Sequence, residues 1–126
     1  SAHAIEDKGV VYPTSEHLYN ALKFRDPAIR AIICAARSPL QAKQLANQVY
    51  RLKQMTHWPQ EKVSAMEYVL RLKLAQHTEV VEVLMGTGNL EIVENSPTDA
   101  FWGCGADGTG QNWLGQLWMK LRDERR

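Results

Sequence analysis

The chain has 126 residues, of which 44% are hydrophobic and 23% are charged, and its formal net charge is +1. This length suits one domain, and this apolar content can form a hydrophobic core, which excludes an intrinsically disordered chain. The small net charge excludes a strong overall attraction to nucleic acid or to an acidic membrane.

Local sequence features also exclude several kinds of protein. The longest apolar run, residues 31–36, is too short to cross a bilayer, and residues 1–8 contain no apolar signal region. Cys34 and Cys104 form no CxxC pair, and the four histidines lack the spacing of metal ligands. We therefore expect a cytoplasmic protein with free thiols, no bound metal and no membrane association.

Capping residues and apolar spacing predict a helix-rich chain. Residues 1–8 are polar and are expected to be loosely ordered, and residues 9–12 are expected to form a short strand that ends at Pro13. The first predicted helix runs from Thr14 or Ser15 to about Phe24, the second begins at Asp26-Pro27 and the third begins at Ser38-Pro39. The fourth runs from Thr56–Pro59 to about Gln76, the fifth runs from His77-Thr78 to Met85, and the last begins at Asn112.

The remaining segments are predicted to be a strand and a loop. Residues 90–93 alternate between apolar and polar and predict a second strand, whereas residues 95–109 are rich in turn formers. Regular alternation of strands and helices is absent, which excludes a doubly wound parallel sheet. The expected fold is α+β, a single helix-rich domain over residues 1–126 with a small β-sheet.

The segment 102–112 is the first candidate site. It contains four of the chain's eight glycines and leads directly into a predicted helix. Glycines let a ligand approach the backbone, and a helix start favours an anion, so the segment predicts a phosphate-binding loop. A flexible surface loop fits the glycine spacing equally well, but the adjacent Asp99 and Trp102 favour a site.

One helix face is the second candidate site. Glu16, Tyr19, Asn20 and Lys23 are spaced i, i+3, i+4 and i+7 and share this face, for which a solvated polar surface is the alternative interpretation. Glu16 lies in the first turn, where the helix dipole favours a carboxylate that can stabilise a developing cation. Trp58, at another helix start, is either a core residue or a ring that stacks on a base. Carboxylates, aromatic rings and a glycine-rich loop together suit cleavage of a phosphorylated sugar from a base.

Three longer motifs resemble the NADAR family, which is also called YbiA-like. These motifs are residues 12–24, 93–103 and 108–115, and the resemblance extends over about residues 9–123. It implies a hydrolase that cleaves the C1′–N bond of a phosphorylated ribose N-glycoside. The substrate is then a ribosylamino intermediate of riboflavin synthesis or ADP-ribosylated guanine. Many family members carry an acidic residue at the position of Cys104.

The resemblance also implies roles for individual residues. Glu16 or Asp99 is expected to stabilise an oxocarbenium-like centre or to activate water, and both are expected to border one cavity. Lys23 is expected either to bind phosphate or to attack C1′ and form a Schiff base. The expected substrate-binding residues are Tyr19, Lys43, Trp58, Glu94, Trp102, Gly103, Gly105, Gly110 and Asn112.

The expected partner is a small phosphoribosyl or ADP-ribosyl molecule, or an ADP-ribosylated nucleic acid. This scheme needs neither a metal nor an organic cofactor. The alternative is a non-catalytic module that binds ADP-ribose or a nucleotide. The absence from residues 1–9 of the family's Phe-Ser-Asn-Phe-type segment favours this module. A structural interaction domain is supported only by the amphipathic last helix.

Overall fold

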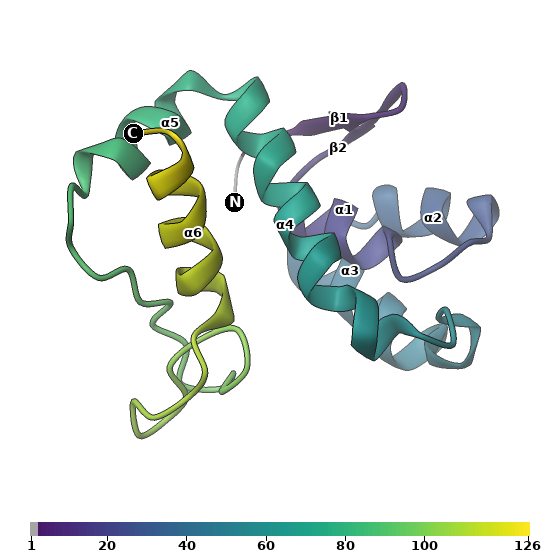
Figure 1. Ribbon diagram of the computed structural model, residues 1–126. Helices are drawn as coiled ribbons and strands as arrows, with labels where there is room; N and C mark the ends of the chain where they lie inside the picture. Colours follow the sequence, from purple (N-terminus) through teal and green to yellow (C-terminus); the bar gives the residue numbers. More distant parts are fainter. Residues whose placement is uncertain (1–2) are drawn as a thin grey trace. The chain divides into compact units, whose positions relative to one another are not determined.

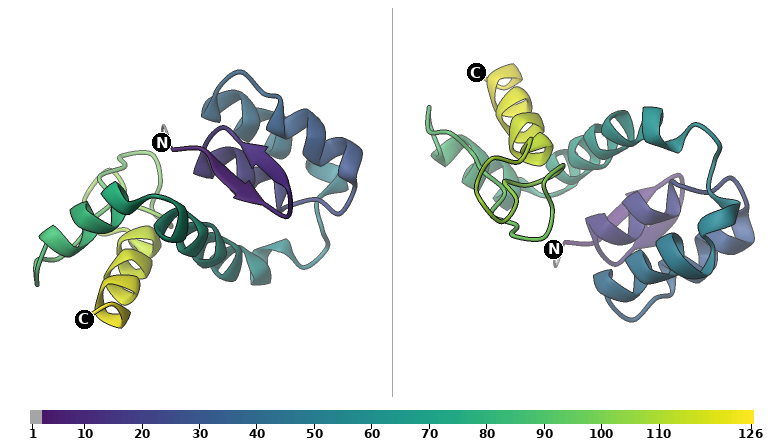
Figure 2. Two further views of the ribbon diagram at one scale, coloured as in Figure 1. Left: turned by 90° about the horizontal axis from the view of Figure 1, so that it is seen from above. Right: turned by 90° about the horizontal axis from the view of Figure 1, so that it is seen from below.

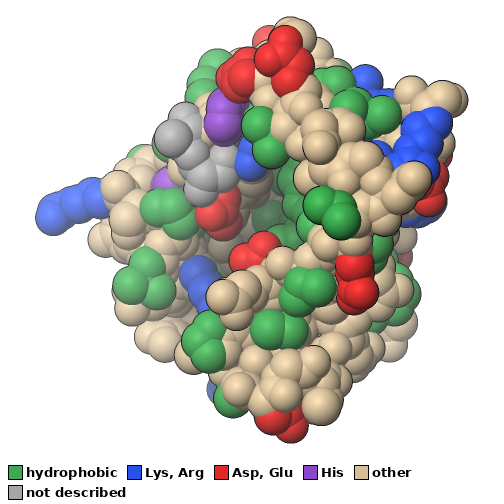
Figure 3. Space-filling model, turned by 90° about the vertical axis from the view of Figure 1, so that its left-hand side faces the viewer, with side chains coloured by type: hydrophobic (Ala, Val, Ile, Leu, Met, Phe, Trp, Pro, Cys, Tyr) green, Lys and Arg blue, Asp and Glu red, His purple; other side chains and the backbone are tan. Residues whose placement is uncertain are grey.

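A computed structural model describes residues 3–126 (Figure 1), which form a helix-rich fold with one two-stranded antiparallel sheet. The chain divides into two compact units, residues up to Gln76 and residues His77–Arg126, and each is described by itself. None of the described helices combines the length and apolarity needed to span a bilayer. Acidic and basic side chains are interspersed on the face shown in Figure 3, in keeping with the small net charge.

The sheet is a hairpin at the start of unit 1. Strand β1 (Ile5–Asp7) pairs with β2 (Val10–Tyr12), and the positive φ angles of Lys8 and Gly9 form the tight turn between them. Strand β2 confirms the first predicted strand, but β1 lies where the polar sequence predicts loose order. The reason is tertiary: Ile5 is fully buried, and the Gln76 side chain bonds both backbone groups of Glu6.

The described part of unit 1 contains four α-helices and two short helical turns, and the first three helices begin at the predicted capping residues. These elements are α1 (Ser15–Ala21), α2 (Pro27–Cys34), α3 (Pro39–Gln44), the π-helical turn η1 (Leu45–Val49), the 3₁₀ turn η2 (Arg51–Lys53) and α4 (Trp58–Gln76). The side chains of Thr14, Asp26 and Ser38 accept hydrogen bonds from backbone N–H groups of the first turns of α1, α2 and α3.

Helix α1 is the centre of unit 1. It packs against α2, α3, α4 and β2 (Figures 1 and 2), and it carries the buried residues Leu18 and Ala21. It ends at Ala21 rather than near Phe24 because the N–H groups of Lys23 and Phe24 bond carbonyls three residues back, which tightens the last turn. This tightened turn places Lys23 at the end of the helix.

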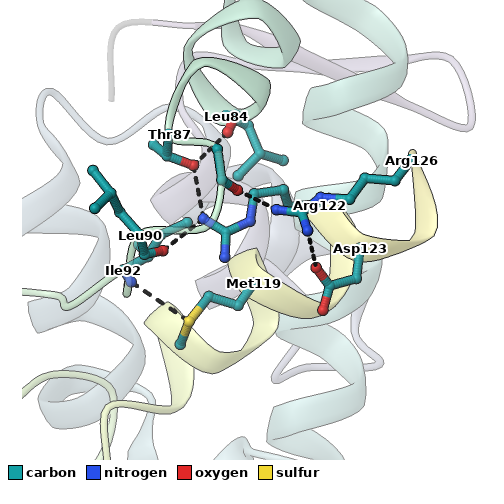
Figure 4. Close-up of polar contacts among 9 residues, drawn as sticks. Leu84, Thr87, Leu90, Ile92, Met119, Arg122, Asp123 and Arg126 are labelled. Atoms are coloured by element: carbon teal, nitrogen blue, oxygen red, sulfur yellow. Dashed lines mark hydrogen bonds and ion pairs between the residues drawn. The ribbon is translucent and has the colours of Figure 1, made fainter.

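Unit 2 consists of α5 (Thr78–Gly86), a long irregular segment and α6 (Trp113–Glu124). The predicted strand over residues 90–93 is wrong, because side chains of residues 112–122 bond the backbone there. Figure 4 shows the bonds that Met119 and Arg122 form with it. Arg122 donates to the Leu90 carbonyl at 2.7 Å, and Asn112 donates to the Ile92 carbonyl at 2.9 Å. Residues 90–93, which alternate between apolar and polar, therefore contact a helix instead of pairing with a second strand.

Candidate functional site

A buried lysine lies among aromatic rings in the turn that follows α1. The Lys23 side chain is 6% exposed, and its Nζ lies 5.2 Å from the ring centre of Tyr19 and 6.0 Å from that of Trp58. The two rings lie 5.4 Å apart with an angle of 59° between their planes. Trp58 is itself only 6% exposed, so it packs in the core and also contacts the proposed catalytic lysine.

Two amide side chains complete this arrangement, and sequence reasoning did not identify them. Lys23 Nζ donates to Asn47 Oδ1 at 2.8 Å, and Gln54 Nε2 donates to the same oxygen at 3.3 Å. Asn47 lies in the π-helical turn η1, and such turns are frequent at functional sites. We name Tyr19, Lys23, Asn47, Gln54 and Trp58 the Lys23 cluster.

The surroundings of Lys23 make its amine less basic than an exposed lysine. Burial, followed by the positive charges of Lys43 and Lys62, lowers the pKa of Lys23 from 10.5 to about 8. Lys43 is exposed on α3 and Lys62 is half-buried on α4. A substantial fraction of the amine is therefore neutral near pH 8, and a neutral amine is a nucleophile.

The predicted carboxylate Glu16 lies two turns before Lys23, and its negative charge affects the pKa of a second lysine, Lys73. Burial lowers the pKa of Lys73 on α4, and the negative charge of Glu16 opposes this effect. Asn20 is 4% exposed and donates to the Glu16 carbonyl at 2.8 Å, while its Oδ1 has no hydrogen-bond partner in the described part of the chain. A buried acceptor of this kind suits a donor group of a ligand.

The glycine-rich loop of unit 2 is held by its own backbone. The N–H groups of residues 110–114 each donate to a carbonyl of residues 100–104, at 2.6–3.0 Å. These N–H groups are thus engaged, which corrects the expectation that they converge on an anion at the start of α6. A Cβ atom at Gly103 or Gly110 would lie within 3 Å of other backbone atoms, so close packing accounts for both glycines.

Three of the other predicted residues of unit 2, Asp99, Trp102 and Asn112, form contacts within that unit. Asp99 Oδ1 accepts from the N–H groups of Phe101 and Trp102, at 2.9 and 2.8 Å, and so caps a turn. The Trp102 ring packs edge-on against the Phe101 ring. Asn112 Oδ1 accepts from the Glu94 N–H at 2.8 Å, while the Glu94 residue is exposed. Gly105 is buried and has a φ of +72°.

The structure thus brings together the predicted residues Tyr19, Lys23 and Trp58, which come from α1, the turn that follows it and α4. Glu16 lies in the first turn of α1. The positive charge of Lys43 helps to lower the pKa of Lys23. Glu16 belongs to unit 1 and Asp99 to unit 2, so the requirement that both border one cavity stays a prediction.

Comparison with known proteins places this chain in a family. The model of the NADAR domain matches residues 1–126. An N-glycosidase from Nostoc punctiforme is 40% identical over 129 residues, which cover 100% of this chain and 82% of that protein. A riboflavin biosynthesis protein from Vibrio vulnificus is 37% identical and matches 96% of this chain, which spans only 33% of the length of that relative.

The fold comparison agrees with the sequence comparison. The NMR structure of the protein YbiA from Escherichia coli superposes with a TM-score of 0.87 at 37% identity, covering 98% of this chain and 73% of that one. The YbiA sequence from this organism carries the name N-glycosidase. These findings confirm the predicted resemblance and the helix-rich fold. The chain therefore belongs to the NADAR family and is homologous to its YbiA-type N-glycosidases.

Proposed function

We propose that this chain is an N-glycosidase that hydrolyses the C1′–N bond of a phosphorylated ribose N-glycoside. Family membership supports the reaction class. The observation that carries the proposal is the buried Lys23 amine, whose pKa is lowered to about 8 and which lies beside two aromatic rings.

Lys23 acts in this proposal as the nucleophile. Its lone pair attacks C1′, the C1′–N bond breaks, and the base leaves with the bonding electron pair and takes a proton. Opening of the sugar ring gives a Schiff base, which water hydrolyses to the free sugar phosphate and the Lys23 amine. Glu16 stabilises the positive charge at C1′, and Asn20 Oδ1 accepts from a ribose hydroxyl.

Phosphate recognition is assigned to the lysines of unit 1 rather than to the glycine-rich loop. The charges of Lys43 and Lys62 both act on Lys23, so these cations create a local positive potential in a nearly neutral chain. The names of relatives in riboflavin biosynthesis support a free ribosylamino metabolite as the substrate. ADP-ribosylated guanine is the second substrate to be tested.

The test offers the purified protein a panel of ribose-phosphate N-glycosides, including ADP-ribosylated guanine in DNA, and measures released base. Reduction with borohydride during turnover should attach the sugar phosphate to Lys23, which mass spectrometry of peptides detects. Lys23→Arg keeps the charge but should abolish turnover and trapping, whereas Lys53→Arg at an exposed position is the matched control. Turnover without trapping would favour attack by water. Tight ADP-ribose binding without turnover would favour the binding module.

A further inference from the structure

The side-chain oxygen of Asn47 is the hydrogen-bond acceptor for the amine of Lys23. The distance of 2.8 Å is that of a good hydrogen bond, and Lys23 is almost completely buried. Within the described residues, no carboxylate forms an ion pair with Lys23, and the charged groups that act on it are the cations Lys43 and Lys62. The amide oxygen is therefore the group that compensates the buried amine.

A second amide fixes which atom of Asn47 faces Lys23. Gln54 Nε2 donates to the Ala46 carbonyl at 2.9 Å, which identifies this terminal atom of Gln54 as the nitrogen. The same nitrogen lies 3.3 Å from the Asn47 terminal atom, which must then be an acceptor. The orientation of the Asn47 amide thus follows from its neighbours, with its oxygen toward Lys23.

The backbone brings these elements together. The Met55 N–H donates to the Lys23 carbonyl at 2.8 Å, which holds the segment containing Gln54 next to the end of α1. The Tyr50 N–H bonds the Leu45 carbonyl five residues back, so η1 is one residue wider than an α-helical turn. This extra residue changes the direction of the side chains in η1 relative to α3, and Asn47 is the one that contacts Lys23.

We propose that Asn47 is the positioning residue of Lys23: its side-chain oxygen, oriented by Gln54, holds the amine in one orientation beside the Tyr19 and Trp58 rings. This inference rests on the proposed role of Lys23 as the nucleophile. Asn47 itself touches no reacting atom and acts through Lys23. A neutral amide suits this role, because a carboxylate at the same place would favour the protonated amine and suppress nucleophilic attack.

The test measures the titration of Lys23 by NMR of the protein labelled with ¹³C at the lysine Cε, with the Lys23 signal assigned from Lys23→Met. Asn47→Ala removes an acceptor that favours the charged amine, so the Lys23 pKa should fall below its value of about 8. Asn47→Asp adds a negative charge, so this pKa should rise. Gln48→Ala and Gln48→Asp change the exposed neighbour in η1 and should leave the titration unchanged.

Turnover gives the second measurement. Asn47→Ala should lower kcat roughly tenfold or more with little change in KM, because a misplaced nucleophile affects the chemical step. Asn47→Asp should shift the pH profile of kcat toward higher pH and restore turnover there. Gln54→Ala should act in the same direction as Asn47→Ala but more weakly, and it replaces that variant if Asn47→Ala does not fold.

The two proposals fail in distinguishable ways. If both Asn47 variants leave the Lys23 titration at about 8, the positioning role is overturned, whatever the activity of the chain. If the titration shifts in opposite directions as expected but no N-glycoside is cleaved, Asn47 positions Lys23 and the proposed reaction is wrong.

Discussion

Replacement of Lys23 by Met is expected to stabilise unit 1 at neutral pH while it removes the proposed nucleophile. The Lys23 pKa lies at about 8 instead of 10.5, so the fold disfavours the ammonium by about 2.5 pH units, or about 3 kcal/mol. Methionine fills similar space without a charge. Loss of the bond to Asn47 and of the ring contacts offsets part of the gain, which leaves about 1–2 kcal/mol of net stabilisation.

This gain depends on pH in a defined direction. Below pH 8, Lys23 is charged in both the folded and the unfolded chain, and the full penalty is present. Between about pH 8 and 10.5 the unfolded chain binds more protons at Lys23 than the folded chain, so the stability of the wild type rises with pH. The advantage of Lys23→Met should therefore be largest below pH 8 and should shrink toward pH 10.5.

Urea unfolding of the wild type, Lys23→Met and Lys23→Arg at about pH 7 and about pH 10 measures this effect, since the difference between variants removes titrations that they share. Arginine keeps its charge over this range, so Lys23→Arg should not recover stability at the higher pH. An equal stability difference between the wild type and Lys23→Met at both pH values would refute the lowered pKa and, with it, the neutral nucleophile.

Three further predictions concern other residues. Glu16→Gln keeps the shape but removes the charge near C1′, so kcat should fall far more than binding of the substrate, as steady-state kinetics would show. Asp99→Ala should lower the free energy of unfolding by about 1 kcal/mol, because two backbone N–H groups lose their acceptor, whereas Asp99→Asn should retain the cap. Equal destabilisation by both Asp99 variants would contradict the capping role. Arg122→Met should cost about 2–4 kcal/mol and speed hydrogen exchange at residues 87–93, since Arg122 bonds Thr87 and Leu90. Unchanged exchange in this segment would show that Arg122 does not hold it.

The helix starts were predictable because each is a local feature. A capping side chain bonds an N–H group only two or three residues ahead, so Thr14, Asp26 and Ser38 identify α1, α2 and α3 without knowledge of the rest of the fold. Strand β1 and the irregular segment at residues 90–93 depend on distant partners, Gln76 in one case and Arg122 in the other. Alternation and polarity over a few residues carry no information about such partners.

In the candidate site, too, features set by nearby residues were predictable and contacts between distant residues were not. The face shared by Tyr19 and Lys23 follows from helical spacing, and the motif around it identifies the family. Asn47 and Gln54 could not be found in this way, because their contact with Lys23 depends on a π-helical turn that leaves no composition signal. The glycine-rich loop suggests an anion site by composition, but close backbone packing accounts for Gly103 and Gly110, and the N–H groups of residues 110–114 bond carbonyls of the same loop.

Burial lowers the pKa of Lys23 more than the charges of Lys43 and Lys62 do, so Lys23 can serve as the nucleophile while a phosphate is bound nearby. A phosphate on Lys43 and Lys62 would neutralise the two cations that help to lower the Lys23 pKa, and its own negative charge would raise that pKa further. Burial, however, is the largest cause of the lowered pKa, and it does not depend on these charges. Lys23 would therefore retain part of its neutral fraction in the substrate complex. Direct binding of phosphate to Lys23 would instead favour the ammonium, so nucleophilic attack and phosphate binding require different lysines in this site.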